Sequence, residues 1–316
     1  MMTKGIEKNT NSTSQINKKN LQMSNSYKKL GIIGCGVMGQ AIFTSIIKNP
    51  ETTELYPNTI YTTNFGDAAV QRVAKVYDEF SQNSIKHVNL SSNENEKVFE
   101  NCDVVILSCK PFMVETIFEK IQKWDVKLIV SIVAGWSIDM LKEATQHIES
   151  KSGKSTKFVR IMTNTPAKFG YGCCVISFEN EGVDFEDFEK KTVDQIFQNC
   201  GSVVELPEKH MDAATSLVGS GPAFVLLMIE SMIDAGIKMG IPYKESKDCA
   251  IKVMEGTSKM VELTGEHPSV LKHQVCTPGG TTISGLIKME ENGVKSGIIS
   301  GLLEAKKVAG ELGKKK

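Results

Sequence analysis

The sequence has no excess of charge of either sign, no long apolar run and no CxxC motif. Its 37 basic and 37 acidic residues cancel to a formal net charge of zero at pH 7. Proteins that coat nucleic acid or an anionic membrane need a clustered excess of lysine and arginine, so we expect no nucleic-acid partner. No stretch approaches the roughly 18 consecutive apolar residues of a membrane span, so we expect no membrane partner.

Metal ligation and a disulfide scaffold are also disfavoured. The chain has eight cysteines in 316 residues, none of them in a CxxC pair, and its five histidines do not fall near them at zinc-ligand spacing. We therefore predict no metal site. Free thiols are typical of a reducing compartment.

The first 26 residues lack arginine and aromatic side chains, and they are rich in Asn, Ser, Thr and Lys. Such a segment buries too little surface to fold, so we predict a disordered tail over residues 1–26. It has neither the apolar core of a secretory signal nor the arginines of an organelle transit peptide. The cytoplasm is the expected compartment, and the mitochondrion is the alternative.

After the tail, strand-like and helix-like segments alternate, which predicts a parallel sheet covered by helices on both faces. Expected helices are Met38–Lys48, Ala68–Tyr77 and Val114–Lys123. Expected strands are Lys29–Ile33, Thr59–Thr63, Val104–Ser108, Leu128–Ile132, Lys157–Ile161, Cys173–Phe178 and Ser202–Leu206. The predicted fold is an α/β Rossmann-like doubly wound domain over residues 27–207.

From residue 208 the strand signals stop, and residues 208–313 are predicted to form an all-α domain. The expected helices are Ala223–Met239, Glu245–Leu263, Thr282–Glu290 and Val294–Leu312. Ala223–Met239 is apolar on more than one face, which is too much for a helix facing solvent. We therefore expect a homo-oligomer, a dimer or an assembly of dimers, in which a symmetric partner covers this helix.

A glycine-rich turn, Gly34-Cys35-Gly36-Val37-Met38-Gly39, joins the first strand to the first helix. Gly34 permits the tight turn, Gly36 lets the backbone approach a pyrophosphate, and Gly39 allows close packing of helix on strand. The phosphates then lie at the helix N-terminus, beside Val37 and Met38. The pattern predicts a dinucleotide site. A tight turn without a ligand is the alternative.

The residues after the second strand bear on which dinucleotide binds. An NAD site has an Asp or Glu at the end of the second strand, whereas this strand ends in Thr63 and Asn64. These side chains permit hydrogen bonds to a 2′-phosphate, which favours NADPH. No arginine follows until Arg72, and Asp67 keeps NADH as the alternative.

Two further strand ends are expected at the same edge of the sheet. The strand predicted third ends in Ser108, followed by Lys110 and Pro111, which places a lysine in the crevice where cofactors of open sheets lie. A solvated lysine beside a helix-starting proline is the alternative. The strand Leu128–Ile132 leads to Ala134 and Gly135, small residues that leave room for a nicotinamide ring.

Three segments of the second half resemble those of pyrroline-5-carboxylate reductases. They follow one another in family order: Arg160-Ile161-Met162-Thr163-Asn164-Thr165-Pro166-Ala167, Leu217-Val218-Gly219-Ser220-Gly221-Pro222-Ala223-Phe224, and Val275-Cys276-Thr277-Pro278-Gly279-Gly280-Thr281-Thr282-Ile283-Ser284-Gly285-Leu286. The resemblance covers about residues 28 to 312 and implies reduction of 1-pyrroline-5-carboxylate to L-proline by NAD(P)H, the last step of proline biosynthesis. It also implies an interlocked homodimer that completes the active site.

The resemblance adds cofactor contacts as well. It places Lys110 and Pro111 on the turn that touches the cofactor. It matches Asn95, or Asn93 with one residue inserted, to a polar contact at the adenosine end. Some family members carry a glutamate where this chain has Gly265, so a substrate contact from the neighbouring Glu266 stays open.

The Pro-Gly-Gly segment has the chemistry of a carboxylate site. Its glycines free backbone N–H groups to converge at the start of a helix. We expect the substrate carboxylate to lie against Thr277, Gly279, Gly280, Thr281 and Thr282. Thr282 is the expected partner of the substrate nitrogen or carboxylate, with Lys110 near the nicotinamide end. An ordinary glycine-rich loop that caps a helix is the alternative.

Two other functions stay open at this point. One is a different small-molecule NADP-dependent reductase on the same scaffold, such as a dehydrogenase of small hydroxy acids, which needs a positioned base in the helical half. The other is a non-catalytic NADP-binding oligomer. The Pro-Gly-Gly-Thr-Thr loop supplies hydroxyls and N–H groups, which favours the imine reductase.

Overall fold

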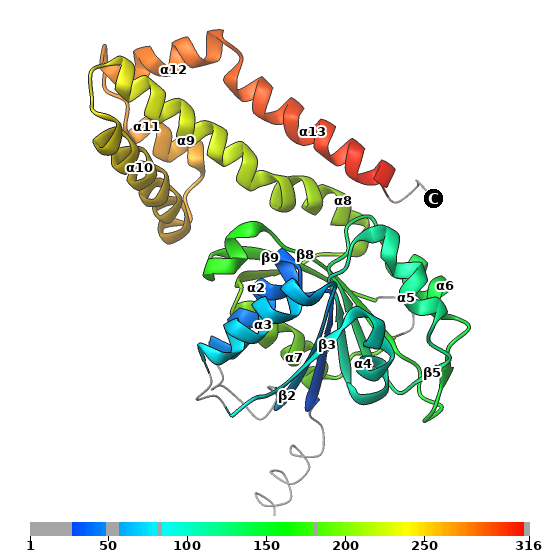
Figure 1. Cartoon of the computed structure of the whole chain (residues 1–316). Helices are drawn as coiled ribbons and strands as arrows, with labels where there is room; N and C mark the ends of the chain where they lie inside the picture. Colours follow the sequence, from blue (N-terminus) through cyan, green and yellow to red (C-terminus); the bar gives the residue numbers. More distant parts are fainter. Residues whose placement is uncertain (1–26, 49–56, 81–83, 180–182, 313–316) are drawn as a thin grey trace, which may run out of the picture.

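The structure is a computed structural model that describes residues 27–48, 57–80, 84–179 and 183–312. The predicted tail, residues 1–26, lies outside this range. An eight-stranded sheet occupies the N-terminal region and a group of long helices the C-terminal region (Figure 1). The predicted fold class is confirmed, while the exact boundary at residues 207 and 208 stays a prediction.

The strands of the sheet follow the order β10-β9-β8-β6-β4-β1-β2-β3, so the chain winds outward from β1 in both directions. All neighbours pair in parallel except β8 and β9, which are antiparallel. Their bounds are β1 Lys29–Ile33, β2 Thr59–Asn64, β3 Lys86–Ser91, β4 Val104–Leu107, β6 Leu128–Ser131, β8 Lys157–Met162, β9 Gly172–Phe178 and β10 Gly201–Glu205. A separate pair, β5 Lys123–Trp124 and β7 Glu149–Ser150, lies outside the main sheet.

Sequence patterns missed β3, so the strand ending at Leu107 is the fourth rather than the third. Apolar residues of the central strands alternate between two cores: Ile32 and Ile106 face one, while Ile33 and Leu107 face the other. Burial on both faces explains why these strands are continuous apolar runs.

Helices cover both faces of the sheet. The core on one face includes residues of α2 (Val37–Lys48), α3 (Asp67–Asp78) and α7 (Asp187–Gln198). The core on the other includes residues of α4 (Asn95–Asn101), α5 (Val114–Glu119) and α6 (Ile138–Thr145). The helix predicted over Val114–Lys123 ends earlier in the structure, at Glu119. A 3₁₀ turn, Pro111–Met113, precedes it.

An ion cluster around the buried Arg160 links the sheet to the helical region. The Arg160 guanidinium, on β8, lies 3.4 Å from Glu208 and 3.7 Å from Asp212, at the start of that region. Glu208 also accepts a hydrogen bond of 2.7 Å from the backbone N–H of Ile138, at the start of α6. Three segments distant in sequence are thereby joined.

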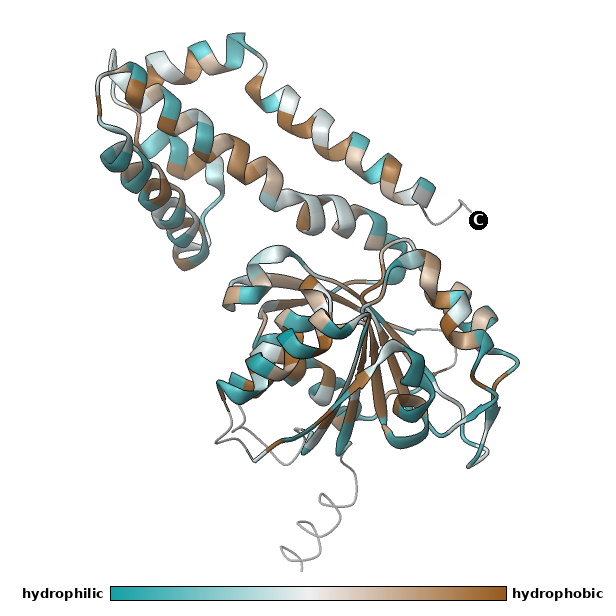
Figure 2. Ribbon diagram, in the orientation of Figure 1, coloured by the Kyte–Doolittle hydropathy of each residue, from teal (hydrophilic) through white to brown (hydrophobic). Residues whose placement is uncertain are grey.

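The helical region begins with α8 (Met211–Ala214) and a π-helical turn, Thr215–Ser220, which continue into α9. Its other helices are α9 Gly221–Lys238, α10 Tyr243–Thr264, α11 Pro268–Gln274, α12 Thr281–Glu291 and α13 Val294–Leu312. Among residues 221–311, only Gly236, Ser246, Ala250, Leu271 and Ala309 are buried. Apolar residues on α9 and α13 therefore face outward (Figure 2).

The helical stretch Glu208–Lys238 is long and apolar enough to cross a bilayer by those two criteria, although it contains no unbroken apolar run of that length. One such helix is weak evidence for a membrane span. An uncovered subunit interface meets the same criteria.

Candidate cofactor and substrate sites

The glycine-rich turn between β1 and α2 is held by the ends of two neighbouring strands. Gly34 has φ of 85°, a conformation that favours glycine, and its backbone N–H donates to the Thr63 carbonyl at 3.1 Å. The Ser108 hydroxyl, just after β4, lies 3.0 Å from the Ile33 carbonyl and 2.7 Å from that of Gly34. The turn is therefore fixed in place.

Gly36 and Gly39 have different surroundings within this turn. A Cβ atom on Gly39 would lie 2.4 Å from the Ser108 hydroxyl oxygen and 2.6 Å from the Gly34 carbonyl oxygen. A Cβ on Gly36 would meet nothing within 4 Å. Gly39 thus permits close packing below the turn, while Gly36 leaves open space above it for a ligand.

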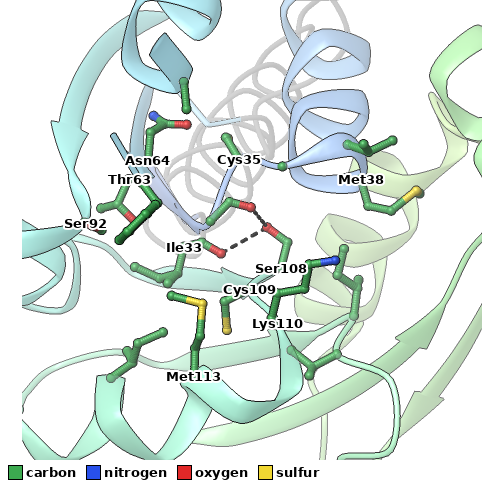
Figure 3. A pocket seen from close by; sticks show the side chains of 18 of the residues that line it. Ile33, Cys35, Met38, Thr63, Asn64, Ser92, Ser108, Cys109, Lys110 and Met113 are labelled. Atoms are coloured by element: carbon green, nitrogen blue, oxygen red, sulfur yellow. Dashed lines mark hydrogen bonds between the residues drawn. The ribbon is translucent and has the colours of Figure 1, made fainter. Parts of the chain in front are cut away.

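A cavity of about 440 Å³ lies over the turn, where the chain winds away from β1 in both directions (Figure 3). Ligands of open α/β sheets bind at this switch point. Eleven of the thirteen residues predicted to bind the cofactor line it: Gly34, Gly36, Val37, Met38, Thr63, Asn64, Asn95, Ser108, Lys110, Pro111 and Ala134. Gly39 and Gly135 are not among the lining residues.

Sequence reasoning missed several lining residues, notably Phe65, Ser92 and Cys109. Arg72 also lines the cavity, although its distance along the chain argued against it. Ser92 follows β3, the strand that was missed, and Arg72 lies in the second turn of α3. The helix expected at Ala68–Tyr77 was the available signal, because the five residues from Asp67 to Arg72 advance only about 7.5 Å along a helix.

The cavity contains positive side chains and no carboxylate. Of its lining residues, only Arg72 and Lys110 carry charge at neutral pH. Burial raises the pKa of the Cys35 thiol, and it raises that of Cys109 to about 11, so both thiols stay neutral. Such a site suits an anionic ligand.

A hydrogen-bonded chain fixes Asn64 at one end of the cavity. Asn89 donates to the Val70 carbonyl at 2.8 Å, so its side-chain oxygen faces Asn64 and accepts from the Asn64 amide at 2.9 Å. The Asn64 oxygen is buried and has no hydrogen-bond partner in the described part of the chain. The Asn64 amide carries two N–H donors, and the bond to Asn89 uses one of them.

The Pro-Gly-Gly segment forms a turn that opens α12. Gly279 has φ of 67°, and the Gly280 N–H donates to the Thr277 carbonyl at 2.9 Å. Thr277 and Thr281 are exposed, and Thr282 is partly exposed. The segment lies far from the cofactor cavity, because α12 lies at the end of the helical region distant from the sheet (Figure 1). One chain therefore does not bring the two predicted sites together.

A second hollow, of about 490 Å³, lies between the segment after β8 and the start of α9. Its lining is mostly apolar and includes Pro166, Phe169, Leu217 and Leu226. No group of three or more metal-ligating side chains occurs in the part of the chain that the structure describes.

An open α/β sheet with a glycine-rich turn and an acid-free cavity at its switch point defines the class of dinucleotide-dependent oxidoreductases. Comparisons with known proteins agree. Residues 29–135 match the family model described as NADP oxidoreductase, coenzyme F420-dependent, and residues 208–312 match that of pyrroline-5-carboxylate reductase dimerisation.

Relatives that match over nearly their whole length are named pyrroline-5-carboxylate reductase. The chain is 48% identical over 294 residues to the pyrroline-5-carboxylate reductase of Kluyveromyces lactis, covering 91% of this chain and 98% of that protein. It is 36% identical to that of Schizosaccharomyces pombe, covering 90% and 98%. The crystal structure of Plasmodium falciparum pyrroline carboxylate reductase with NADP bound is 28% identical, with a TM-score of 0.71 over 90% of this chain and 98% of that one.

The chain belongs to the pyrroline-5-carboxylate reductase family.

Proposed function

We propose that this protein reduces 1-pyrroline-5-carboxylate to L-proline with hydride from NADPH, the final step of proline biosynthesis. The observation that carries the proposal is 48% identity across nearly the whole length of a reductase of this name. The cavity over the glycine-rich turn has no acidic lining residue, which supports a dinucleotide phosphate as its ligand. NADP bound to the P. falciparum relative supports NADPH as the form used here.

The residues around the cavity fit a dinucleotide. Gly36 leaves room for a pyrophosphate, and Val37 and Met38, the first residues of α2, line the same cavity, where a helix N-terminus favours phosphate. Bound nicotinamide in its reduced form supplies the hydride. Lys110, Pro111 and Ala134 would surround the nicotinamide end, where Trp136 donates a hydrogen bond of 3.1 Å to the Pro111 carbonyl and holds this turn in position.

The substrate needs positioning more than acid–base chemistry. A cyclic imine is partly protonated near neutral pH, and the iminium carbon accepts hydride readily, so correct placement supplies much of the rate. The Thr277–Thr282 segment would hold the substrate carboxylate through its N–H groups and hydroxyls. Thr282 would bond the ring nitrogen or the carboxylate.

The two half-sites belong to different subunits in this proposal. The Pro-Gly-Gly segment and the cofactor cavity lie apart within one chain, and the region between them matches a dimerisation family. A homodimer in which the segment of one subunit covers the cavity of the other would unite them. The exposed apolar residues of α9 and α13 would form its interface.

For the compartment, we propose the cytoplasm, with the mitochondrion as the alternative, because the eight cysteines are free thiols, which is typical of a reducing compartment.

The test is oxidation of NADPH by the purified protein on addition of pyrroline-5-carboxylate, with proline measured as product. We expect stoichiometric proline and a higher kcat/KM with NADPH than with NADH. Absence of proline at saturating cofactor would rule out the function. A tenfold preference for NADH would overturn only the choice of cofactor.

A further inference from the structure

Arginine is rare in this protein, and its two arginines lie in different surroundings. The sequence has two arginines, Arg72 and Arg160, among its 37 basic residues; all the others are lysines. Arg160 is buried against two carboxylates. A guanidinium presents a planar fork of donors that matches a carboxylate or phosphate, whereas a lysine ammonium is a point charge. Arg72 is therefore a candidate for binding an anion of this kind.

Arg72 has no hydrogen bond or ion pair in the described part of the chain, and it lines the cofactor cavity. The helix that carries it is well anchored. The Val70 carbonyl accepts a hydrogen bond of 2.8 Å from Asn89, and the Tyr77 hydroxyl donates at 2.8 Å to the Ile85 carbonyl. Arg72 is thus held at a defined position, although its side chain has no partner there.

The helix that carries Arg72, α3, packs against β2 and β3. Thr63, Asn64 and Ser92 lie on one side of the cavity and Lys110 on the other (Figure 3). The first side is the end of β2, where ribose hydroxyls of the adenosine bind in open α/β sheets.

An acid that would repel a phosphate is missing at the same place. NAD sites carry Asp or Glu at the end of the second strand, and this chain has neutral Asn64 there. Asp67, the first carboxylate after the strand, is not among the cavity-lining residues. Phe65 lines the rim with 81% of its surface exposed, so its ring is available to stack on a base.

We propose that Arg72 binds the 2′-phosphate of NADPH and is the residue by which this protein selects NADPH over NADH. Phe65 supplies the adjacent stacking surface for the adenine. The inference rests on the proposed dinucleotide-dependent function, and it assigns cofactor selection to one side chain. The N–H groups of the guanidinium donate to the phosphate oxygens, and Lys110 takes no part.

The test uses two adenosine fragments that carry no nicotinamide. Isothermal titration calorimetry of the full-length protein would measure the affinity for adenosine 2′,5′-bisphosphate and for 5′-AMP. We expect Arg72→Gln to weaken the bisphosphate about 10- to 100-fold, a range typical of losing a charged hydrogen-bond donor, and to change AMP affinity less than about 2-fold. Arg72→Lys should fall between, because it keeps the charge and loses the fork.

Lys75→Gln is the matched control. It removes one positive charge from an exposed position on the same helix, and Lys75 does not line the cavity. It should leave both affinities unchanged. Phe65→Ala should weaken both fragments equally, because both contain adenine.

Three outcomes would overturn the proposal. One is equal loss of both fragments in Arg72→Gln; another is the same bisphosphate loss in Lys75→Gln. The third is a wild-type protein that binds AMP as tightly as the bisphosphate. None of these requires pyrroline-5-carboxylate, so a failure here is distinct from failure of the reductase assay.

Discussion

The glycines of the turn after β1 show how one residue type serves two different constraints. Gly39 is tightly enclosed by the Ser108 hydroxyl and the Gly34 carbonyl, and Gly36 faces open space. A methyl group at the first position must displace backbone, whereas at the second it only enters the ligand's space. We therefore expect a side chain at Gly39 to impair folding and a side chain at Gly36 to impair ligand binding.

We predict that Gly39→Ala lowers the free energy of unfolding by about 1–3 kcal/mol, the usual cost of forcing an extra methyl into a packed site. Urea unfolding without cofactor would measure it. Gly36→Ala is the matched control: it should unfold at the wild-type urea concentration and bind NADPH more weakly. Equal stability of the two variants would contradict this division of roles.

At this scale the sequence predicted the shape of the glycine-rich turn but not the place of Arg72 at the cavity. Glycine spacing after a strand has one common structural solution, so Gly34, Gly36 and Gly39 were assigned roles that match the geometry of the turn. Arg72 was set aside because its separation along the chain is not its separation in space. Hydrogen bonds such as Asn64 to Asn89 depend on a neighbouring strand and leave no pattern in sequence.

Strand β3 illustrates what sequence patterns miss among the elements. Lys86–Ser91 lies at the edge of the sheet, and its residues after Lys86 are only partly buried. It therefore lacks the apolar run that marks the central strands. The antiparallel β9 was also missed in orientation, because local sequence reports burial and not strand direction.

His87 of β3 lies in a contact with a measurable pH signature. Its ring packs against Phe43 at 4.7 Å and Tyr77 at 4.9 Å between ring centroids. Its Nε2 lies 2.9 Å from the Thr62 hydroxyl, which donates onward to Asn89. Burial lowers the pKa of His87 to about 4, and Asp78 offsets this in part.

We predict that the folded state loses stability as pH falls from about 6.5 toward 4. The unfolded chain binds a proton at His87 in this range and the folded chain does not, so stability rises with pH. The loss between pH 7 and pH 5 should be about 2 kcal/mol. Urea unfolding at the two pH values would measure it. In a His87→Gln variant, which cannot titrate at this position, the loss of unfolding free energy between pH 7 and pH 5 should be smaller by about 2 kcal/mol. If the variant loses as much as the wild type, His87 is not the group responsible.

At the scale of the whole molecule, the chain has a complete core in one region and little in the other. The sheet region has large apolar clusters on both faces, while α9 to α13 expose Leu226, Leu227, Leu263 and Leu303. The sequence predicted this contrast, since Ala223–Met239 is apolar on several faces. It did not predict how far the Pro-Gly-Gly segment lies from the cavity, because that distance depends on the arrangement of the long helices.

A mixed dimer would show whether the site spans two subunits. We predict that a heterodimer of Gly36→Val and Thr282→Ala subunits, purified through two different tags, has about half the activity of the wild-type dimer, since one of its two equivalent sites is intact. Each parent homodimer should be far less active. If cavity and loop of the same chain worked together, no intact site would exist, and the heterodimer would be as inactive as its parents.

The order of the two regions along the chain also has a consequence during translation. The sheet strands from Lys29 to Glu205 leave the ribosome before α9 begins at Gly221, and domains generally fold in that order. The nucleotide cavity is therefore finished while the apolar helices are still being made. A chain that stops before Gly221 therefore carries the cavity but lacks α9 and α13, whose exposed apolar residues are proposed to form the dimer interface.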